Sequence, residues 1–187
     1  MTVKTDYSRF HIHDELTAPE GSDRVLKAIE STGGSVPKFI GVVAEAPRAL
    51  AAFAKMRSEL RAGSIPERTQ VKIALSVAEA RGDGYGVAQA ARTARRLGLG
   101  LDEISRARSF DSQDESEKHL LTLLKETRTA DGHPPTYLVE EAREAGWSDE
   151  QLLEAIALVA LNEFQSLTAN MAGLPVDQVD GEIPTAA

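Results

Sequence analysis

Apolar residues along this chain recur three and four positions apart, the spacing that aligns them on one face of a helix. Val71, Ala74, Leu75 and Ala78 form one such stripe. No segment alternates apolar and polar residues for long enough to predict a strand. The pattern therefore predicts an all-α protein. The expected helices span about residues 22–32, 39–44, 47–60, 66–80, 85–97, 102–108, 114–127, 134–146 and 148–171.

Glycines and capping residues mark where these helices begin and end. The segments 114–117 (Asp-Glu-Ser-Glu) and 148–151 (Ser-Asp-Glu-Gln) have the capping-box pattern, in which paired side chains satisfy free backbone N–H groups. We expect Asp102 to cap the helix that follows it, and the glycine pair 33–34 to end the first helix. The strongest break is the segment 81–86, with three glycines in six residues.

Length and charge narrow the class of protein. A length of 187 residues is typical of a single domain. The composition, with 42% apolar and 27% charged residues, is close to the average of globular proteins. We therefore expect a single domain over residues 1–187. The 21 Lys and Arg against 29 Asp and Glu give a formal charge of −8, which argues against nucleic-acid binding because phosphates need a basic surface.

The sequence gives no sign of membrane insertion or secretion. The longest uninterrupted apolar run is 155–161, far below the roughly 20 residues that cross a bilayer. The opening residues MTVKTDYSRF lack the apolar segment of a secretory signal. We expect a cytoplasmic protein without a membrane partner.

The chain contains no cysteine. This count excludes disulfides, zinc–thiolate sites, iron–sulfur clusters and every cysteine nucleophile. It limits the chemistry of the protein more than any motif does.

The glycine-rich break carries the first candidate site. Asp83 could act there as a general base or substrate anchor with Tyr85 as its hydrogen-bond partner. The commoner use of an aspartate in such a turn is to cap the helix that follows. Glu79, one turn earlier, either lines the rim of a pocket or forms a surface ion pair with Arg68 or another arginine.

Glu163 is a carboxylate on an apolar stripe that includes Ile156, Ala160 and Leu167. Loss of hydration raises the pKa of such a group unless a cation compensates, which would suit a general acid or base. Alternatively, Glu163 pairs with an arginine of the segment 92–96 or supports a contact between subunits.

The helix after the break carries cations at helical spacing. Gln89, Arg92 and Arg96 lie three and four residues apart and are candidates to clamp a small acidic ligand. A solvated helix face whose cations favour the C-terminal dipole is the alternative.

His11, His13 and Asp14 cluster near the start of the chain but lack a third firmly spaced partner for a metal ion. We expect no metal site and no cofactor.

Four segments, in this order, resemble the carboxymuconolactone decarboxylase superfamily and, within it, the alkylhydroperoxidase-D-like branch. They are FHIHDELTAPEGS (10–22), VPKFIGVVAEAPRALAAF (36–53), ERTQVKIALSVAEARGDGYGVAQAARTARRLGL (67–99) and GWSDEQLLEAIALVALNEFQSLTANMAGLPVD (146–177). The resemblance covers about residues 10–180. It implies a compact all-helical protomer that assembles into a homo-oligomer, a trimer or a hexamer.

The resemblance fails at the residues that carry the chemistry of that branch. Its members have a Cys-x-x-Cys pair and a histidine near the break, because a thiolate attacks the peroxide and a second thiol resolves the product. This chain has Asp83 and Gly86 at the thiol positions and Ala90 at the histidine position, and residues 70–72 offer no match for an upstream glutamate. Thiol peroxidase activity is excluded, and the histidine pattern of the decarboxylases is also missing.

Three hypotheses remain. The chain is a cysteine-free protein that binds a small molecule or forms a non-redox oligomer. Alternatively, it is an acid–base enzyme, of decarboxylase or isomerase type, that acts on a small acidic or lactone metabolite, with residues drawn from Glu79, Asp83, Tyr85 and Glu163. The third hypothesis is a subunit that assembles only with a cysteine-bearing relative.

Overall fold

The computed structural model describes residues 8–31 and 36–176. Every regular element in these ranges is a helix, which confirms the predicted all-α class. The helices are α1 (Asp23–Glu30), α2 (Lys38–Val43), α3 (Pro47–Arg61), α4 (Glu67–Ala80), α5 (Gly84–Arg96), α6 (Leu101–Ala107), α7 (Glu115–Thr129), α8 (Thr136–Glu144) and α9 (Asp149–Ala172). The glycine pair 33–34, expected to end the first helix, lies outside the described residues.

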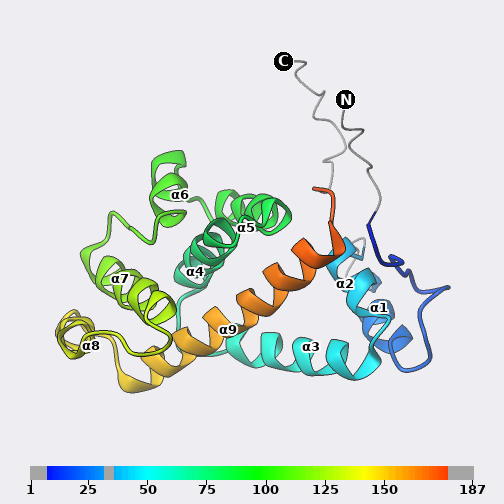
Figure 1. Cartoon of the computed structure of the whole chain (residues 1–187), viewed down its shortest axis with the longest axis horizontal. Coiled ribbons are helices and arrows are strands. Elements are labelled where there is room, and N and C mark those ends of the chain that lie inside the picture. The colour runs from blue at the N-terminus through cyan, green and yellow to red at the C-terminus, as the bar shows by residue number, and fades with distance from the viewer. Residues whose placement is uncertain (1–7, 32–35, 177–187) are drawn as a thin grey trace, which may run out of the picture.

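Helix α9 is the central element of the fold. It runs diagonally across the molecule, with α4 to α8 on one side and α1 to α3 on the other (Figure 1). It packs against α2, α3, α4, α5 and α7, so side chains from both halves of the chain meet on it. By length and composition alone, α9 is the one described helix that could span a membrane, but a central helix of a fold passes the same test.

The two capping-box predictions had different outcomes. At α9 the box is complete, because Ser148 Oγ accepts from the N–H of Gln151 and the Gln151 side chain accepts from the N–H of Ser148. At α7, Asp114 caps the N–H of Glu117 at 2.9 Å, but the Glu117 carboxylate turns into the protein instead of returning to the cap. A buried cation therefore competes successfully for that carboxylate.

Asp102 is not the cap of α6. The helix begins at Leu101 with Gly100 in the capping position, so the predicted cap lies two residues too far along the chain. Asp102 and Glu103 both lie in the first turn, where negative charge favours the helix dipole.

A buried ionic network joins α4, α6 and α7. Lys72 of α4 donates to the carboxylates of Glu103 and Glu117 and, at 3.0 Å, to Ser112 Oγ. Burial raises the pKa of Glu103, but hydrogen bonds from Lys72, Ser112 and the N–H of Gln113 outweigh that effect and lower it overall. Glu103 is therefore held ionised, and one ammonium group bridges the two carboxylates.

Candidate functional site

A pocket of about 590 Å³ lies between α3, α4, α5 and α9, with α2 closing one side. Its apolar lining comes from all five helices and includes Phe39, Ile40, Phe53, Val71, Ala74, Leu158 and Leu161. The rings of Phe39 and Phe53 meet edge to face with centroids 5.0 Å apart. One wall is therefore aromatic and suits a flat or apolar ligand body.

The charged residues of this pocket are mostly arginines. Arg57 and Arg61 come from α3 and Arg96 from α5, whereas Glu67 is the one acidic residue among the described lining residues. Arg61 lies 3.9 Å from Glu67, and Arg96 donates to the hydroxyl of Thr93. No carboxylate among the described residues pairs with Arg57 or Arg96. The pocket is locally cationic in a chain with a net charge of −8.

Arg57 lies in an unfavourable place for an unpaired cation. The side chain of Arg57 is exposed to solvent, but neighbouring protein still removes part of its hydration and lowers its pKa, and the nearby charge of Arg61 lowers it further. Tyr85 opposes the shift. A guanidinium remains protonated at neutral pH, so the electrostatic free energy of the pocket improves when an anion binds.

The structure brings Tyr85 and Gln89 together in the pocket wall, and the Tyr85 hydroxyl bonds to Gln89 and not to Asp83, the partner proposed from sequence. The Tyr85 ring is buried, and its hydroxyl accepts from the backbone N–H of Phe39 and from Gln89 Nε2, each at 3.3 Å. Both residues line the pocket. Arg92 does not line it, whereas Arg96, one turn further along α5, does.

Asp83 caps α5, which confirms the commoner of its two predicted uses. Oδ1 accepts from the N–H of Gly86 at 2.8 Å, and the residue is 1% exposed. The second oxygen, Oδ2, has no hydrogen-bond partner. Burial raises the pKa of Asp83 and outweighs the opposing effects of the Gly86 amide and the nearby Ser166 hydroxyl.

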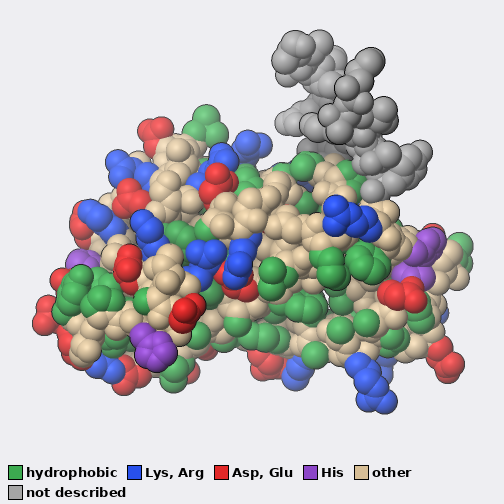
Figure 2. Space-filling view, viewed as in Figure 1, with side chains coloured by type: hydrophobic (Ala, Val, Ile, Leu, Met, Phe, Trp, Pro, Cys, Tyr) green, Lys and Arg blue, Asp and Glu red, His purple; other side chains and the backbone are tan. Residues whose placement is uncertain are grey.

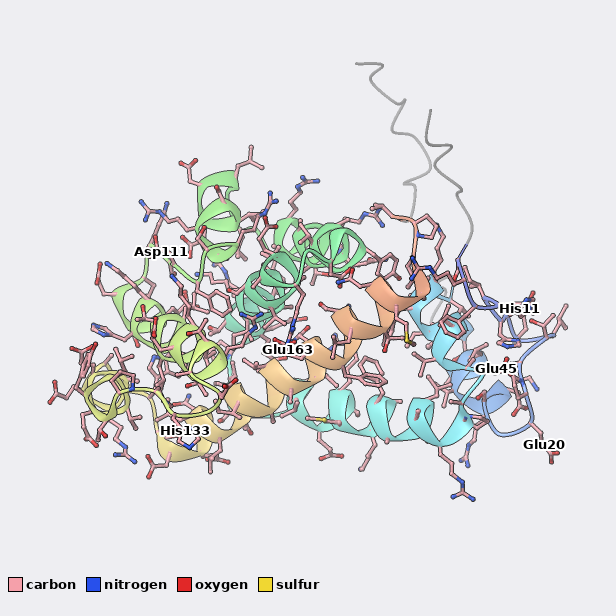
Figure 3. The ribbon with its side chains drawn as sticks, viewed as in Figure 1. His11, Glu20, Glu45, Asp111, His133 and Glu163 are labelled. Atoms are coloured by element: carbon pink, nitrogen blue, oxygen red, sulfur yellow. The ribbon has the colours of Figure 1, made fainter. Side chains whose placement is uncertain are left out.

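Glu79 and Glu163 do not line the pocket; both form ion pairs elsewhere. Glu79 accepts from Arg108 Nε at 2.8 Å. Glu163 accepts from Arg81 Nε and, at 2.5 Å, from Arg128 Nε, and lies near the middle of the molecule (Figure 3). The structure thus favours an ion-pair role for each: Glu79 pairs with an arginine other than Arg68, and the partners of Glu163 lie outside the segment 92–96.

The expected partners were Arg68 for Glu79 and the segment 92–96 for Glu163. Helical spacing shows which residues share a stripe, but it does not show which neighbouring helix faces that stripe. The side of α9 that carries Glu163 faces the end of α4 and the helix α7, which contribute Arg81 and Arg128. Each carboxylate oxygen of Glu163 accepts from a guanidinium group, and the residue does not line the pocket, so it is not placed to act on a ligand there.

Sequence reasoning missed the arginines of α3 and the polar residues of α9 that line the pocket. These residues are Arg57, Arg61, Asn162, Gln165 and Ser166. A signal for the first two was present, because Arg57 and Arg61 are four residues apart on one helix. Nothing in the sequence showed that this stripe faces α4 and α5.

The other polar clusters are internally satisfied. The ring of His13 is bound between Thr17 O, 2.8 Å from Nδ1, and Glu45, 2.5 Å from Nε2, with His11 edge-on beside it. Within the described ranges, no three His, Asp or Glu side chains are placed to hold a metal ion. A second hollow, of about 840 Å³, is lined in part by Lys72 and its two carboxylate partners, Glu103 and Glu117.

Comparison with known proteins supports the fold. No family model and no curated protein matches the sequence. A solved structure described as an alkylhydroperoxidase AhpD core, an uncharacterized peroxidase-related protein from Ralstonia eutropha JMP134, has a TM-score of 0.81 at 17% identity, covering 91% of this chain and 92% of that one. A peroxidase-related protein from Silicibacter sp. TM1040 has a TM-score of 0.79 at 15% identity, covering 95% of each chain.

The debrominase Bmp8 has the same fold. Its TM-score is 0.70 at 20% identity, covering 84% of this chain and 87% of Bmp8. A cysteine-to-alanine variant of Bmp8 has been solved with 2,3,4-tribromopyrrole. This chain therefore has the AhpD-like helical fold, as the resemblance implied, without the cysteines. At these identities the comparison shows the fold and leaves the activity open.

Proposed function

We propose that this protein binds a small organic anion in the pocket between α3, α4, α5 and α9 and performs no thiol chemistry. The observation that carries the proposal is the unpaired guanidinium of Arg57 within that pocket. An anionic ligand would give this guanidinium group hydrogen bonds and a counter-charge in place of the hydration that the surrounding protein removes.

The composition of the pocket favours a ligand with an apolar body. Phe39, Phe53 and the aliphatic side chains around them suit a ring or a short hydrocarbon, while Arg57 and Arg96 suit a carboxylate. The Bmp8 structures support this ligand class, since that protein, with the same fold, has been solved with a small halogenated aromatic molecule.

Thermal unfolding in the presence of benzoate tests the proposal. A ligand at 100 times its dissociation constant adds about 2.7 kcal/mol to the unfolding free energy, which raises the melting temperature by several degrees. Arg57→Gln should abolish this shift. Arg48→Gln, on an exposed position of the same helix, is the matched control and should retain it. Equal shifts in both variants would contradict the proposal.

Acid–base catalysis is the second candidate, because the pKa of Asp83 is raised beside the pocket that contains Tyr85. An enzyme of this kind, decarboxylase- or isomerase-like, converts its carboxylate or lactone ligand. Chromatography of the incubation mixture distinguishes it from a binding protein, which returns its ligand unchanged.

We further propose that the protein forms a homo-oligomer through α9. Its outer side carries a row of exposed apolar side chains: Leu153, Ile156, Phe164, Leu167 and Met171. The first and the last are 18 positions, or five turns, apart, and those between them lie close to the same side of the helix, so the five form one stripe. In Figure 2 hydrophobic side chains gather across the middle of the visible face, where α9 crosses in Figure 1. A subunit that depends on a cysteine-bearing relative is the alternative.

A further inference from the structure

The Asp83 carboxyl is a buried polar group that the fold leaves half satisfied. Oδ1 accepts the N–H of Gly86 in the cap of α5, whereas Oδ2 has no partner at hydrogen-bond distance, although the Ser166 hydroxyl is near enough to interact with the carboxyl. A buried polar atom without a partner costs free energy, and folded proteins keep few of them without a functional reason. Whether Oδ2 can interact with a bound ligand therefore depends on where this atom lies relative to the anion pocket.

Three small residues separate Oδ2 from the pocket. A Cβ atom on Gly86 would lie 2.2 Å from Oδ2 and 3.1 Å from the Cβ of Ala78, so these groups adjoin one another. The Ser166 hydroxyl is close enough to affect the pKa of Asp83. Gly86, Ala78 and Ser166 all line the pocket. Oδ2 thus lies one layer beneath the pocket wall, behind a stretch without any large side chain.

The surroundings of Asp83 favour its neutral form. Burial is the largest effect on its pKa and raises it, and the amides of Gly86 and Tyr85 and the Ser166 hydroxyl only partly oppose it. A neutral carboxylic acid carries one O–H donor, and Oδ2 is the free oxygen on which that proton can reside.

Among residues 8–31 and 36–176, no charged group is one of the main causes of the pKa shift of this carboxyl. On α4, Glu79 pairs with Arg108, and Arg81, just beyond its end, pairs with Glu163 of α9. The Tyr85 hydroxyl of α5 is bound to Phe39 and Gln89. From α3, Arg57 acts on Tyr85 and is not among the groups that shift Asp83.

We propose that protonated Asp83 donates a hydrogen bond from Oδ2 to the Ser166 hydroxyl, which in turn donates to an uncharged oxygen of the ligand whose carboxylate binds Arg57. The inference rests on the proposed function and narrows its ligand class. The ligand is an organic carboxylate with a second, neutral oxygen acceptor, such as a keto group, at the far end of an apolar body.

Two matched probes test this ligand class. 4-Acetylbenzoate and 4-isopropenylbenzoate have the same charge and a planar substituent of similar size, and differ in that a methylene group replaces the carbonyl oxygen. One hydrogen bond corresponds to a preference of about 2- to 10-fold in dissociation constant. Calorimetric titration of the wild-type protein over a pH series from about 5 to 8 should show 4-acetylbenzoate binding more tightly by this factor at the acid end of the series.

The pH dependence identifies Asp83 as the donor. Because the protonated form binds, the preference is fully present below the pKa of Asp83 and is lost as the pH rises through it. Asp83→Asn keeps an oxygen for the cap of α5 and places a permanent N–H donor at the second position, so its preference should not change with pH. Arg57→Gln should weaken the binding of both probes equally.

The outcomes separate the two proposals. Equal binding of both probes to the wild-type protein at every pH overturns the role of Asp83 and leaves the anion site intact. An identical pH profile in wild type and Asp83→Asn overturns it as well. If the asparagine variant does not fold, the pH profile of the wild-type preference still tests the role of Asp83. Proton uptake on binding, measured by calorimetry in two buffers, then shows whether a group is protonated when the ligand binds. Failure of both probes to bind at any pH overturns both proposals.

Discussion

At the scale of single residues, the tightest constraint lies at the start of α5. The carboxyl of Asp83 occupies the space where a side chain at position 86 would begin, so the glycine there is required by close packing. Its backbone N–H is also the donor that the cap uses.

Gly86→Ala should therefore destabilise the protein. The new methyl group displaces Asp83, and loss of the cap with the accompanying strain costs about 1–3 kcal/mol of unfolding free energy. Gly84→Ala is the control, because a Cβ atom there meets nothing within 4 Å. Urea denaturation of both variants measures the difference. Similar stabilities would show that the carboxyl is free to move.

Single residues also show why the candidate site was only partly predictable from the sequence. The cap at Asp83 and the closeness of Tyr85 to Gln89 follow from local spacing along one helix. The partners of Glu163 are 82 and 35 residues away, and no local pattern contains that information. Arg57 became a site residue only when α3 was placed against the rest of the pocket.

At the scale of elements, the helices themselves were predictable, because apolar periodicity, glycines and caps are local signals. The packing of α4 against α6 and α7 was not predictable from the sequence. This packing depends on Lys72, which lies at the centre of a buried ionic network. The apolar stripe of this helix gave no reason to expect a buried lysine there. Its side chain is 7% exposed, and the carboxylates of Glu103 and Glu117 are 10% and 14% exposed.

Lys72→Met should destabilise the fold by about 3–5 kcal/mol at neutral pH, because two buried carboxylates lose their cation. The lowered pKa of Glu103 means that its contribution in the wild-type protein is present above its ordinary value of 4.5 and is lost as the pH falls through the lowered value. The cost of Lys72→Met should accordingly shrink in acid, where protonation removes the unpaired charge.

Denaturation curves at neutral pH and at about pH 4 measure this cost in each condition. Adding Glu103→Gln and Glu117→Gln to Lys72→Met supplies the control, since the charges are then removed together. A cost that stays constant across this pH range would contradict the ionic explanation.

At the scale of the whole molecule, α9 has two uses. One side supplies Leu158, Asn162 and Ser166 to the pocket, and another carries the exposed apolar stripe. Monomeric proteins seldom leave a long apolar row open to water, which is the reason to expect assembly through this helix.

Leu167→Glu, in the middle of this stripe, should reduce the molecular mass in solution from that of an oligomer to that of one chain. Leu167 is 56% exposed, so the charge disturbs an interface and not the core of the protomer. Leu101→Glu, on an exposed leucine of α6, is the control and should leave the mass unchanged. Light scattering after size exclusion measures both. A wild-type chain that runs as a monomer would contradict the assembly and favour dependence on a relative.

The packing of Asp83 against Gly86 also restricts how this turn can change during evolution. Any side chain at position 86 collides with the carboxyl at position 83, so a cysteine cannot appear there first without disrupting the start of α5. Replacing Asp83 first removes the cap but leaves the space open. A path between this turn and a two-cysteine turn therefore has a preferred order, in which the aspartate is lost before the glycine gains a side chain.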